Sequence, residues 1–241
     1  MSSEWVALFS GGKDSSLALH RARSSGRTLT CAVTAQPRGD SYLFHTPATN
    51  LVSLLSESAG VDHVTFPVDE AESRDSQTAG ETELAALEAT LLEIDETCMS
   101  GIEGIVVGVV ESRYQRERMD RLCNRYGYEL YAPLWGSDPR KTLESMVDLG
   151  FDIRIIAVAA DGLDESWLGR QLDEDAIESL IGFADSHGVH PMGEGGEYET
   201  LVVDGPHLDR PLQIDATPRW DGVRGHLVIE DARLGPTPGR S

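Results

Sequence analysis

Near its start the sequence reads Trp5-Val6-Ala7-Leu8-Phe9-Ser10-Gly11-Gly12-Lys13-Asp14-Ser15, and this stretch governs the interpretation of all that follows. Apolar residues 5–9 predict a strand and residues 14–24 predict a helix, so the glycines form a tight turn between them. Glycine tolerates positive φ and has no Cβ, so Gly11 and Gly12 let backbone N–H groups approach an anion. The helix directs its positive end to the same place. The stretch therefore predicts a phosphate-binding loop.

The polar side chains of this loop fit a nucleotide. Lys13, which we expect to be exposed, offers a positive charge to phosphate oxygens, while Ser10 and Ser15 offer hydroxyl donors. Asp14 either caps the helix or helps to hold a magnesium ion. The spacing does not fit a Walker NTPase, and the third glycine of a dinucleotide fingerprint is missing. The alternative is a surface turn without function, capped by Asp14.

The hexapeptide Ser10–Ser15 resembles the PP-loop, Ser-Gly-Gly-x-Asp-Ser, of the N-type ATP pyrophosphatases. The resemblance implies an adenine nucleotide alpha hydrolase-like fold. It also implies that ATP is cleaved between its α- and β-phosphates, which leaves an adenylated substrate for a nucleophile to attack.

Strands and helices alternate along the first half of the chain. Further strands are expected at 28–35, 61–68 and 105–110, and further helices at 49–59 and 81–100. This order predicts an α/β fold with a doubly wound, mostly parallel sheet, in which ligands bind at the carboxyl ends of the strands. Cys31 is expected to be a small buried residue of the second strand.

The pattern changes after Trp135. A helix is expected at 139–149, a strand at 153–158, and glycine-rich turns with β-like segments at 200–203 and 226–229. We therefore expect an ATP-binding domain at 1–135 and a smaller C-terminal α+β domain, which binds the other substrate, at 136–241.

Two further motifs carry polar side chains to the expected site. Gly108, Ser112, Tyr114, Gln115 and Arg116 follow the strand at 105–110, so they leave the sheet on the same rim as the phosphate loop. Alternatively, they begin a solvated helix whose arginines pair with nearby acids.

The second motif is Gly193-Glu194-Gly195-Gly196-Glu197-Tyr198-Glu199-Thr200. Its three carboxylates repel one another, so they need a cation or a positively charged ligand. The alternative is an acidic turn in an already acidic protein.

Composition narrows the class of protein. The 241 residues carry a formal net charge of -21, and Lys13 and Lys141 are the only lysines. We interpret this surface as adapted to a salt-rich cytoplasm, with an ordinary acidic protein as the alternative. No basic groove for nucleic acid, apolar membrane span or signal sequence is evident, which predicts a soluble cytoplasmic protein.

Five motifs, in family order, resemble the diphthine–ammonia ligase family: Ser10–Ser15, Ser41–Pro47, Tyr114–Arg118, Pro133–Trp135 and Glu194–Thr200. The resemblance implies that ATP with Mg²⁺ adenylates the carboxylate of diphthine, a modified histidine of translation elongation factor two. Free ammonium then gives the amide, diphthamide, with AMP and pyrophosphate. The trimethylammonium group of diphthine, or ammonium, would contact the acidic motif.

The resemblance also implies roles for individual residues. Catalytic roles fall to Lys13, Asp14, Glu194, Glu197 and Glu199, with Asp14 also a metal ligand. Nucleotide binding falls to Ser10, Gly11, Gly12, Lys13, Asp14, Ser15, His45, Gly108, Ser112, Tyr114 and Gln115. Substrate binding falls to Arg116, Gly195, Gly196, Tyr198 and Thr200.

Other functions stay open at this point. One is an RNA-modifying ATP pyrophosphatase that adenylates a tRNA base, although it would favour a basic surface. Another is an adenine-nucleotide sensor without catalysis, which need not keep Lys13 or the acidic motif. A homodimer is equally open.

The charge imbalance predicts that salt stabilises the fold and raises activity. At ~1 M salt the Debye length falls to ~3 Å, so repulsion among an excess of 21 negative charges is screened. Thermal unfolding should have a higher midpoint in molar potassium chloride than in dilute buffer. A sharp transition at the same temperature in both would contradict the salt-adapted interpretation.

Overall fold

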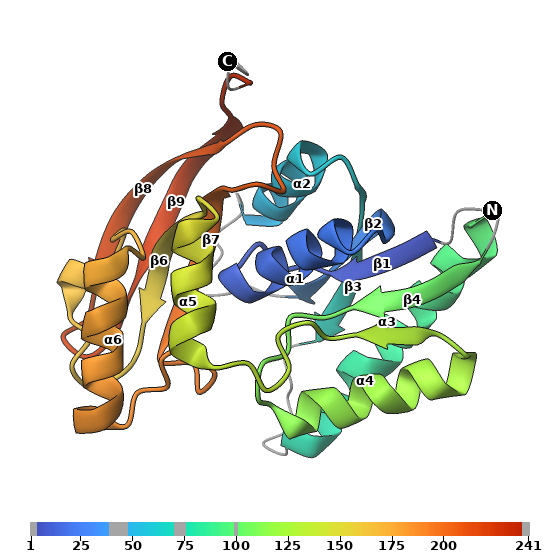
Figure 1. Ribbon diagram of the computed structural model, residues 1–241, viewed down its shortest axis with the longest axis horizontal. Coiled ribbons are helices and arrows are strands. Elements are labelled where there is room, and N and C mark those ends of the chain that lie inside the picture. The colour runs from blue at the N-terminus through green and yellow to red at the C-terminus, as the bar shows by residue number, and fades with distance from the viewer. Residues whose placement is uncertain (1–3, 39–47, 70–75, 99–100, 238–241) are drawn as a thin grey trace.

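The computed structural model describes residues 4–38, 48–69, 76–98 and 101–237. These residues form two sheets with helices packed around them (Figure 1). The strands are β1 (Glu4–Leu8), β2 (Thr28–Arg38), β3 (Asp62–Asp69), β4 (Ile102–Val106), β5 (Glu129–Tyr131), β6 (Asp152–Val158), β7 (Tyr198–Asp204), β8 (Leu212–Trp220) and β9 (Gly225–Leu234). The helices are α1 (Lys13–Ser24), α2 (Ala48–Ser58), α3 (Ser76–Thr97), α4 (Arg113–Tyr126), α5 (Pro139–Asp148) and α6 (Glu174–His187), with a 3-10 turn at Glu165–Trp167.

The first sheet is parallel, in the order β3-β2-β1-β4-β5. Side chains alternate across it: Trp5 and Ala7 of β1 face one core, and Val6 faces another. Helices α1 and α2 cover the first face, and α3 and α4 cover the second. The sequence prediction of a doubly wound α/β fold is therefore confirmed.

The second sheet is antiparallel, in the order β7-β6-β9-β8. Helices α5 and α6 pack on one of its faces, around buried Leu143, Met146 and Leu180. Its other face meets α1 and α2, because Val203 and Leu227 share a core with Leu19 and Leu55. The smaller C-terminal α+β part was thus predicted correctly, and it packs directly on the parallel-sheet half.

Several details differ from the sequence prediction, and strand β5 is among the elements that were not expected. The strand expected at 105–110 ends at Val106, because Val107 and Val110 are buried without continuing the strand. An apolar run reports burial, and burial alone does not specify a strand. Helix α6 and strand β8 were missed among the glycine-rich turns expected after residue 158.

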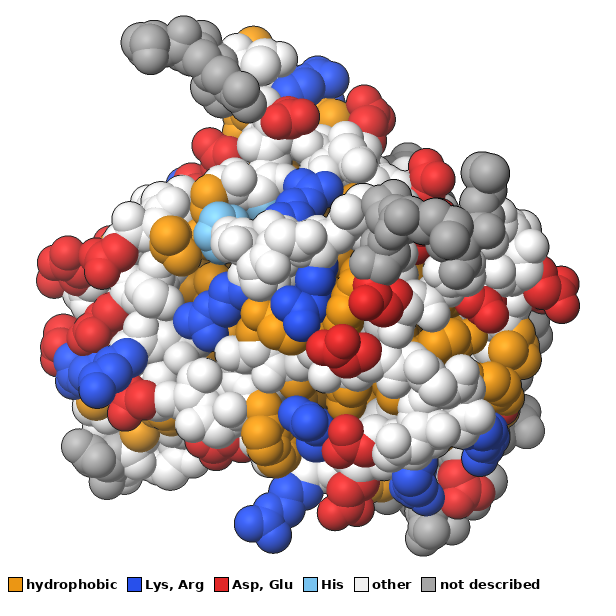
Figure 2. Space-filling model, turned by 45° about the vertical axis from the view of Figure 1, so that its right-hand side comes forward, with side chains coloured by type: hydrophobic (Ala, Val, Ile, Leu, Met, Phe, Trp, Pro, Cys, Tyr) orange, Lys and Arg blue, Asp and Glu red, His pale blue; other side chains and the backbone are white. Residues whose placement is uncertain are grey.

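Cys31 is buried in β2, as predicted. Acidic and basic side chains are interspersed over the face in Figure 2, with apolar surface between them. Within the described residues, no helix combines the length and the apolar character that a bilayer crossing needs.

A buried histidine joins the two sheets. His207 follows β7 and is 4% exposed. Its ring stacks on Phe151, with centroids 5.3 Å apart, and meets the edge of Phe9 at 6.5 Å. Neither ring nitrogen has a hydrogen-bond partner within the described part of the chain. Burial, aided by the charges of His20 and Arg23, lowers the pKa of His207 to about 3.

This histidine predicts acid sensitivity of the fold. Below pH ~6.5 the unfolded chain binds a proton at this position, whereas the folded chain stays neutral until about pH 3. The pKa is lowered in the folded state, so stability is complete above pH ~6.5 and falls by about 1.4 kcal/mol per pH unit below it.

Replacing His207 with Phe keeps an aromatic ring and removes the titration. Between pH 6.5 and 5 the unfolding free energy of the wild type should therefore fall more than that of H207F. The difference between the two decreases should be about 2 kcal/mol. Urea unfolding at each pH measures this, with H226Q, a replacement of a half-buried histidine in β9, as the control. Parallel curves for wild type and H207F would contradict the prediction.

Candidate functional site

The loop at residues 10–12 connects β1 to α1 at the carboxyl end of the parallel sheet. Gly11 has φ +77°, and a Cβ there would lie 2.8 Å from Leu55 Cδ1. Gly12 is the N-cap of α1, with no side-chain capping bond. The alternative in which Asp14 caps the helix is therefore wrong, because Asp14 lies inside the first turn.

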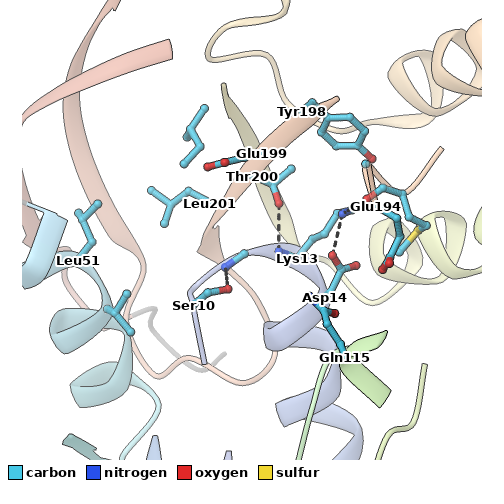
Figure 3. Close-up of a pocket in the computed structure, with 16 residues that line it drawn as sticks. Ser10, Lys13, Asp14, Leu51, Gln115, Glu194, Tyr198, Glu199, Thr200 and Leu201 are labelled. Atoms are coloured by element: carbon cyan, nitrogen blue, oxygen red, sulfur yellow. Dashed lines mark hydrogen bonds and ion pairs between the residues drawn. The ribbon is translucent and has the colours of Figure 1, made fainter. Parts of the chain in front are cut away.

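Strand β7 is hydrogen-bonded to this loop. The N–H of Val202 donates to the carbonyl of Gly11 at 2.9 Å. The N–H of Lys13 donates to Thr200 Oγ1 at 3.1 Å, as the dashed line in Figure 3 shows. The C-terminal sheet thus fixes the conformation of the phosphate-binding loop.

Lys13 is buried, with 3% exposure, so the expectation of an exposed loop lysine is wrong. Its Nζ donates to Asp14 Oδ2 at 2.9 Å and to the carbonyl of Met192 at 2.5 Å, and lies 5.2 Å from the ring centre of Tyr198. Burial alone would lower the pKa of Lys13, but Asp14, Tyr198 and Glu194 together raise it above its ordinary value. The ammonium group therefore stays charged while it ties the loop to the acidic motif.

Two side chains of the acidic motif, Glu197 and Tyr198, form hydrogen bonds with nearby backbone groups. Glu197 accepts backbone N–H bonds from His190 at 2.9 Å and from Gly195 at 2.8 Å. Tyr198 is buried and donates its hydroxyl to the carbonyl of Pro191 at 2.5 Å, and burial raises the pKa of Tyr198 to about 12. Glu197 thus organises the loop, and the structure does not bring it into the cavity beside Lys13.

A cavity of about 430 Å³ lies between the loop and β7 (Figure 3). Its polar lining comes from both halves of the chain: Ser10, Gly12, Lys13, Asp14, Gly108, Gln115, Glu194, Tyr198, Glu199 and Thr200. Asp14 Oδ1 is buried there and has no hydrogen-bond partner among the described residues. The surrounding protein displaces water from Glu199 and raises the pKa of its carboxyl. We call this space the acidic cavity.

A second cavity, of about 510 Å³, opens at the carboxyl ends of β1, β2 and β4. We call it the sheet-edge cavity. Its lining is mostly apolar, and it includes Phe9, Val33, Phe66, Leu87 and Met119, together with the polar Ser15, Thr34, Ser112 and Tyr114. An apolar cleft with a few polar groups is the usual form of a site for an organic ligand.

The two cavities share a wall. Ser10, Asp14, Gly108 and Gln115 line both of them. A Cβ on Gly108 would lie 2.7 Å from the backbone carbon of Asp14, so the segment after β4 approaches α1 here as closely as glycine allows. The phosphate-binding loop therefore lies between two ligand-sized spaces.

The remaining predicted residues lie outside this wall. Ser112 caps α4 by accepting the N–H of Gln115 at 3.4 Å, and Tyr114 is 52% exposed at the sheet-edge cavity. Arg116 lines neither cavity: it pairs with Asp120 at 3.1 Å, as the alternative interpretation of this helix start expected. Gly195 and Gly196 are exposed in the acidic motif and also line neither cavity. His45 and the motif Ser41–Pro47 lie outside the described residues.

Sequence reasoning missed the apolar part of both cavities. Leu51 and Val52 of α2 and Ile156 of β6 line the acidic cavity. Aliphatic residues in a helix or strand look the same whether they face a core or a ligand, so the sequence carried no signal for them.

Comparison with known proteins identifies the family of this chain. Family models described as the diphthamide synthase N-terminal domain and C-terminal domain match residues 3–130 and 138–234. Proteins named diphthine–ammonia ligase in Danio rerio and Homo sapiens are each 31% identical to this chain. The two alignments cover 88% of this chain, with 86% of the fish protein and 83% of the human one.

A solved structure, a predicted subunit of a tRNA methyltransferase from Methanocaldococcus jannaschii, has 18% identity and a TM-score of 0.46. That likeness covers 85% of this chain and 98% of the other. It is too coarse to support an inference about function.

The contacts of Lys13 predict a role in stability. Replacing Lys13 with Met keeps the aliphatic stem and removes the ammonium group, which leaves the carbonyl of Met192 and the carboxylate of Asp14 without this donor. We expect K13M to unfold with about 1.5–3 kcal/mol less free energy, measured by urea denaturation. K141M, a change of the exposed lysine of α5, is the matched control and should stay within about 0.5 kcal/mol. Equal stability of K13M and wild type would show that these contacts do not hold the sheets together.

Proposed function

The chain belongs to the diphthamide synthase family, and from that membership we propose that it is a ligase that amidates diphthine with ammonium at the expense of ATP. The observation that carries the proposal is the position of the phosphate-binding loop between two cavities that share one wall. One space can hold the nucleotide and the other its reaction partner. The α-phosphate and the carboxylate would then meet at the wall.

We assign adenosine to the sheet-edge cavity, where Phe9, Val33 and Phe66 offer an apolar surface at the strand ends. The phosphates extend from there to the loop, where Ser10 and Ser15 offer hydroxyl donors. Asp14 fits a magnesium ligand, because its buried Oδ1 has no other partner among the described residues. Magnesium there would neutralise phosphate charge and help pyrophosphate to depart.

The acidic cavity then receives the side chain to be amidated. A carboxylate resists nucleophiles until one of its oxygens becomes part of a good leaving group. Attack of that oxygen on the α-phosphate releases pyrophosphate, and ammonia then displaces AMP from the acyl-adenylate. Asp14 and Glu194 line the part of this cavity in which the ammonium ion would be held.

The lining of the cavities favours this substrate over RNA. Asp14, Glu194 and Glu199 line the acidic cavity against one lysine, Lys13. Asp14 also lines the sheet-edge cavity, together with the acidic Glu83 and the basic Arg118. Carboxylates repel a phosphate backbone and attract ammonium groups. The family implies that the protein substrate is translation elongation factor two, which carries diphthine. The acidic composition suits a salt-rich cytoplasm.

The proposal predicts the products of turnover. With ATP, magnesium, ammonium chloride and elongation factor two that carries diphthine, the protein should form AMP and pyrophosphate in equal amounts, with one diphthamide for each AMP. Chromatography of the nucleotides and mass spectrometry of the modified peptide measure this. Accumulation of ADP and phosphate would refute cleavage at the α-phosphate.

A substitution at Gly108, in the wall that the two cavities share, tests whether this wall positions the reactants. Gly108→Ala would place a Cβ against the backbone of Asp14, so it should lower AMP formation by at least about tenfold. Gly182→Ala in α6 is the control, because a Cβ there meets nothing within 4 Å. Equal activity of both variants would argue that the wall does not bring the reactants together.

A further inference from the structure

Glu199 and Leu201 lie on the same face of β7, because side chains two residues apart in a strand point the same way. Figure 3 shows the Glu199 carboxylate on the Leu201 side of Thr200, away from Lys13, Asp14 and Glu194. The acidic cavity therefore has two ends. One end holds the lysine and two carboxylates, and the other holds Glu199.

The Glu199 end is otherwise aliphatic. The side chains that line it come from three elements: Leu51 and Val52 from α2, Ile156 from β6 and Leu201 from β7. Among the described residues, the Glu199 carboxylate has no hydrogen-bond or ion-pair partner. Glu199 is exposed on β7, so its carboxylate is open to an incoming cation. The surrounding protein raises the pKa of this carboxyl, and a cation beside it would stabilise the charged form.

The geometry points to a subsite for a quaternary ammonium group, formed by the Glu199 carboxylate and the aliphatic side chains of Leu51, Val52, Ile156 and Leu201. Such a cation has a methyl surface and no N–H donor, so it prefers apolar contact with one nearby negative charge to a cage of hydrogen-bond acceptors. A bare ammonium ion, with four N–H donors, suits the polar end beside Asp14 and Glu194 better.

The subsite rests on the proposed function and makes it more specific. In diphthine the trimethylammonium nitrogen and the carboxylate are attached to the same carbon, so the two groups must bind close together. Leu201 and Val52 meet that requirement, because a Cβ built on Gly11 of the phosphate loop would lie 3.6 Å from Leu201 Cδ1 and 3.9 Å from Val52 Cγ2. Seating the trimethylammonium group here brings the neighbouring carboxylate to the loop.

A binding experiment tests the subsite without turnover. Tetramethylammonium chloride is added to the full-length protein, and the methyl NMR signals of Leu51, Val52 and Leu201 are followed, with potassium chloride at equal ionic strength as the reference. The wild type should show saturable shifts specific to tetramethylammonium. Glu199→Gln should bind it at least about tenfold more weakly, and E144Q, a charge removal on the exposed surface of α5, should bind it as the wild type does. Absence of specific shifts in the wild type would overturn the subsite.

Steady-state kinetics test whether the reaction uses the subsite at Glu199. E199Q should raise the KM for elongation factor two with diphthine at least about tenfold and change kcat less than about threefold. Val52→Thr keeps the shape and adds a hydroxyl to the wall, so it should raise the same KM. Thermal melts confirm that both variants are folded. A lower kcat at unchanged KM would overturn the subsite, because it would assign Glu199 to proton transfer.

The two readouts separate the subsite from the proposed function. Specific tetramethylammonium binding without any AMP formation by the wild type would refute the ligase activity alone. Normal amidation with unchanged KM in E199Q would refute the subsite alone.

Discussion

The arrangement of this protein depends on the hydrogen bonds between β7 and the loop at residues 10–12, which we propose binds phosphate. The carbonyl of Gly11 and the N–H of Lys13 are both bound by β7, at Val202 and at Thr200 Oγ1. A glycine-rich loop loses much conformational entropy when it is ordered, so a rigid partner is needed to hold one geometry. The C-terminal sheet is that partner. The site is consequently a product of both halves of the chain.

The same constraint explains why residues far apart in sequence act in one place. Once β7 is fixed on the loop, the acidic motif lies over Lys13, whose ammonium bonds to the carbonyl of Met192. On the opposite side, Gly108 brings the segment after β4 against the first turn of α1. The loop is thereby held from two directions, and each direction contributes one cavity. Preorganisation of this kind lets two reactants meet without rearrangement of the protein.

The sequence predicted the parts of this site that have local signatures. The turn at Gly11 and Gly12 was found because the need for glycine there is local, and the alternating strands and helices gave the parallel sheet. The sequence could not predict the burial of Lys13 or the hydrogen bonds of the Glu197 carboxylate to backbone N–H groups. Each depends on tertiary contacts that have no local sequence signature. Helix α6 was missed because neighbouring glycines and acids obscured its apolar periodicity.

The charges that line the acidic cavity indicate which reactants it can accept. Its charged lining consists of Lys13 against Asp14, Glu194 and Glu199, so carboxylates outnumber ammonium groups. Lys13 already bonds to Asp14, which leaves little positive charge for an incoming anion. An anionic reactant can enter such a space only together with cations. In the function that we propose, magnesium with ATP, ammonium as the nitrogen source and the fixed charge of diphthine would each meet that condition. The excess of carboxylates, which looks unsuited to a nucleotide enzyme, therefore matches a reaction whose partners bring positive charge with them.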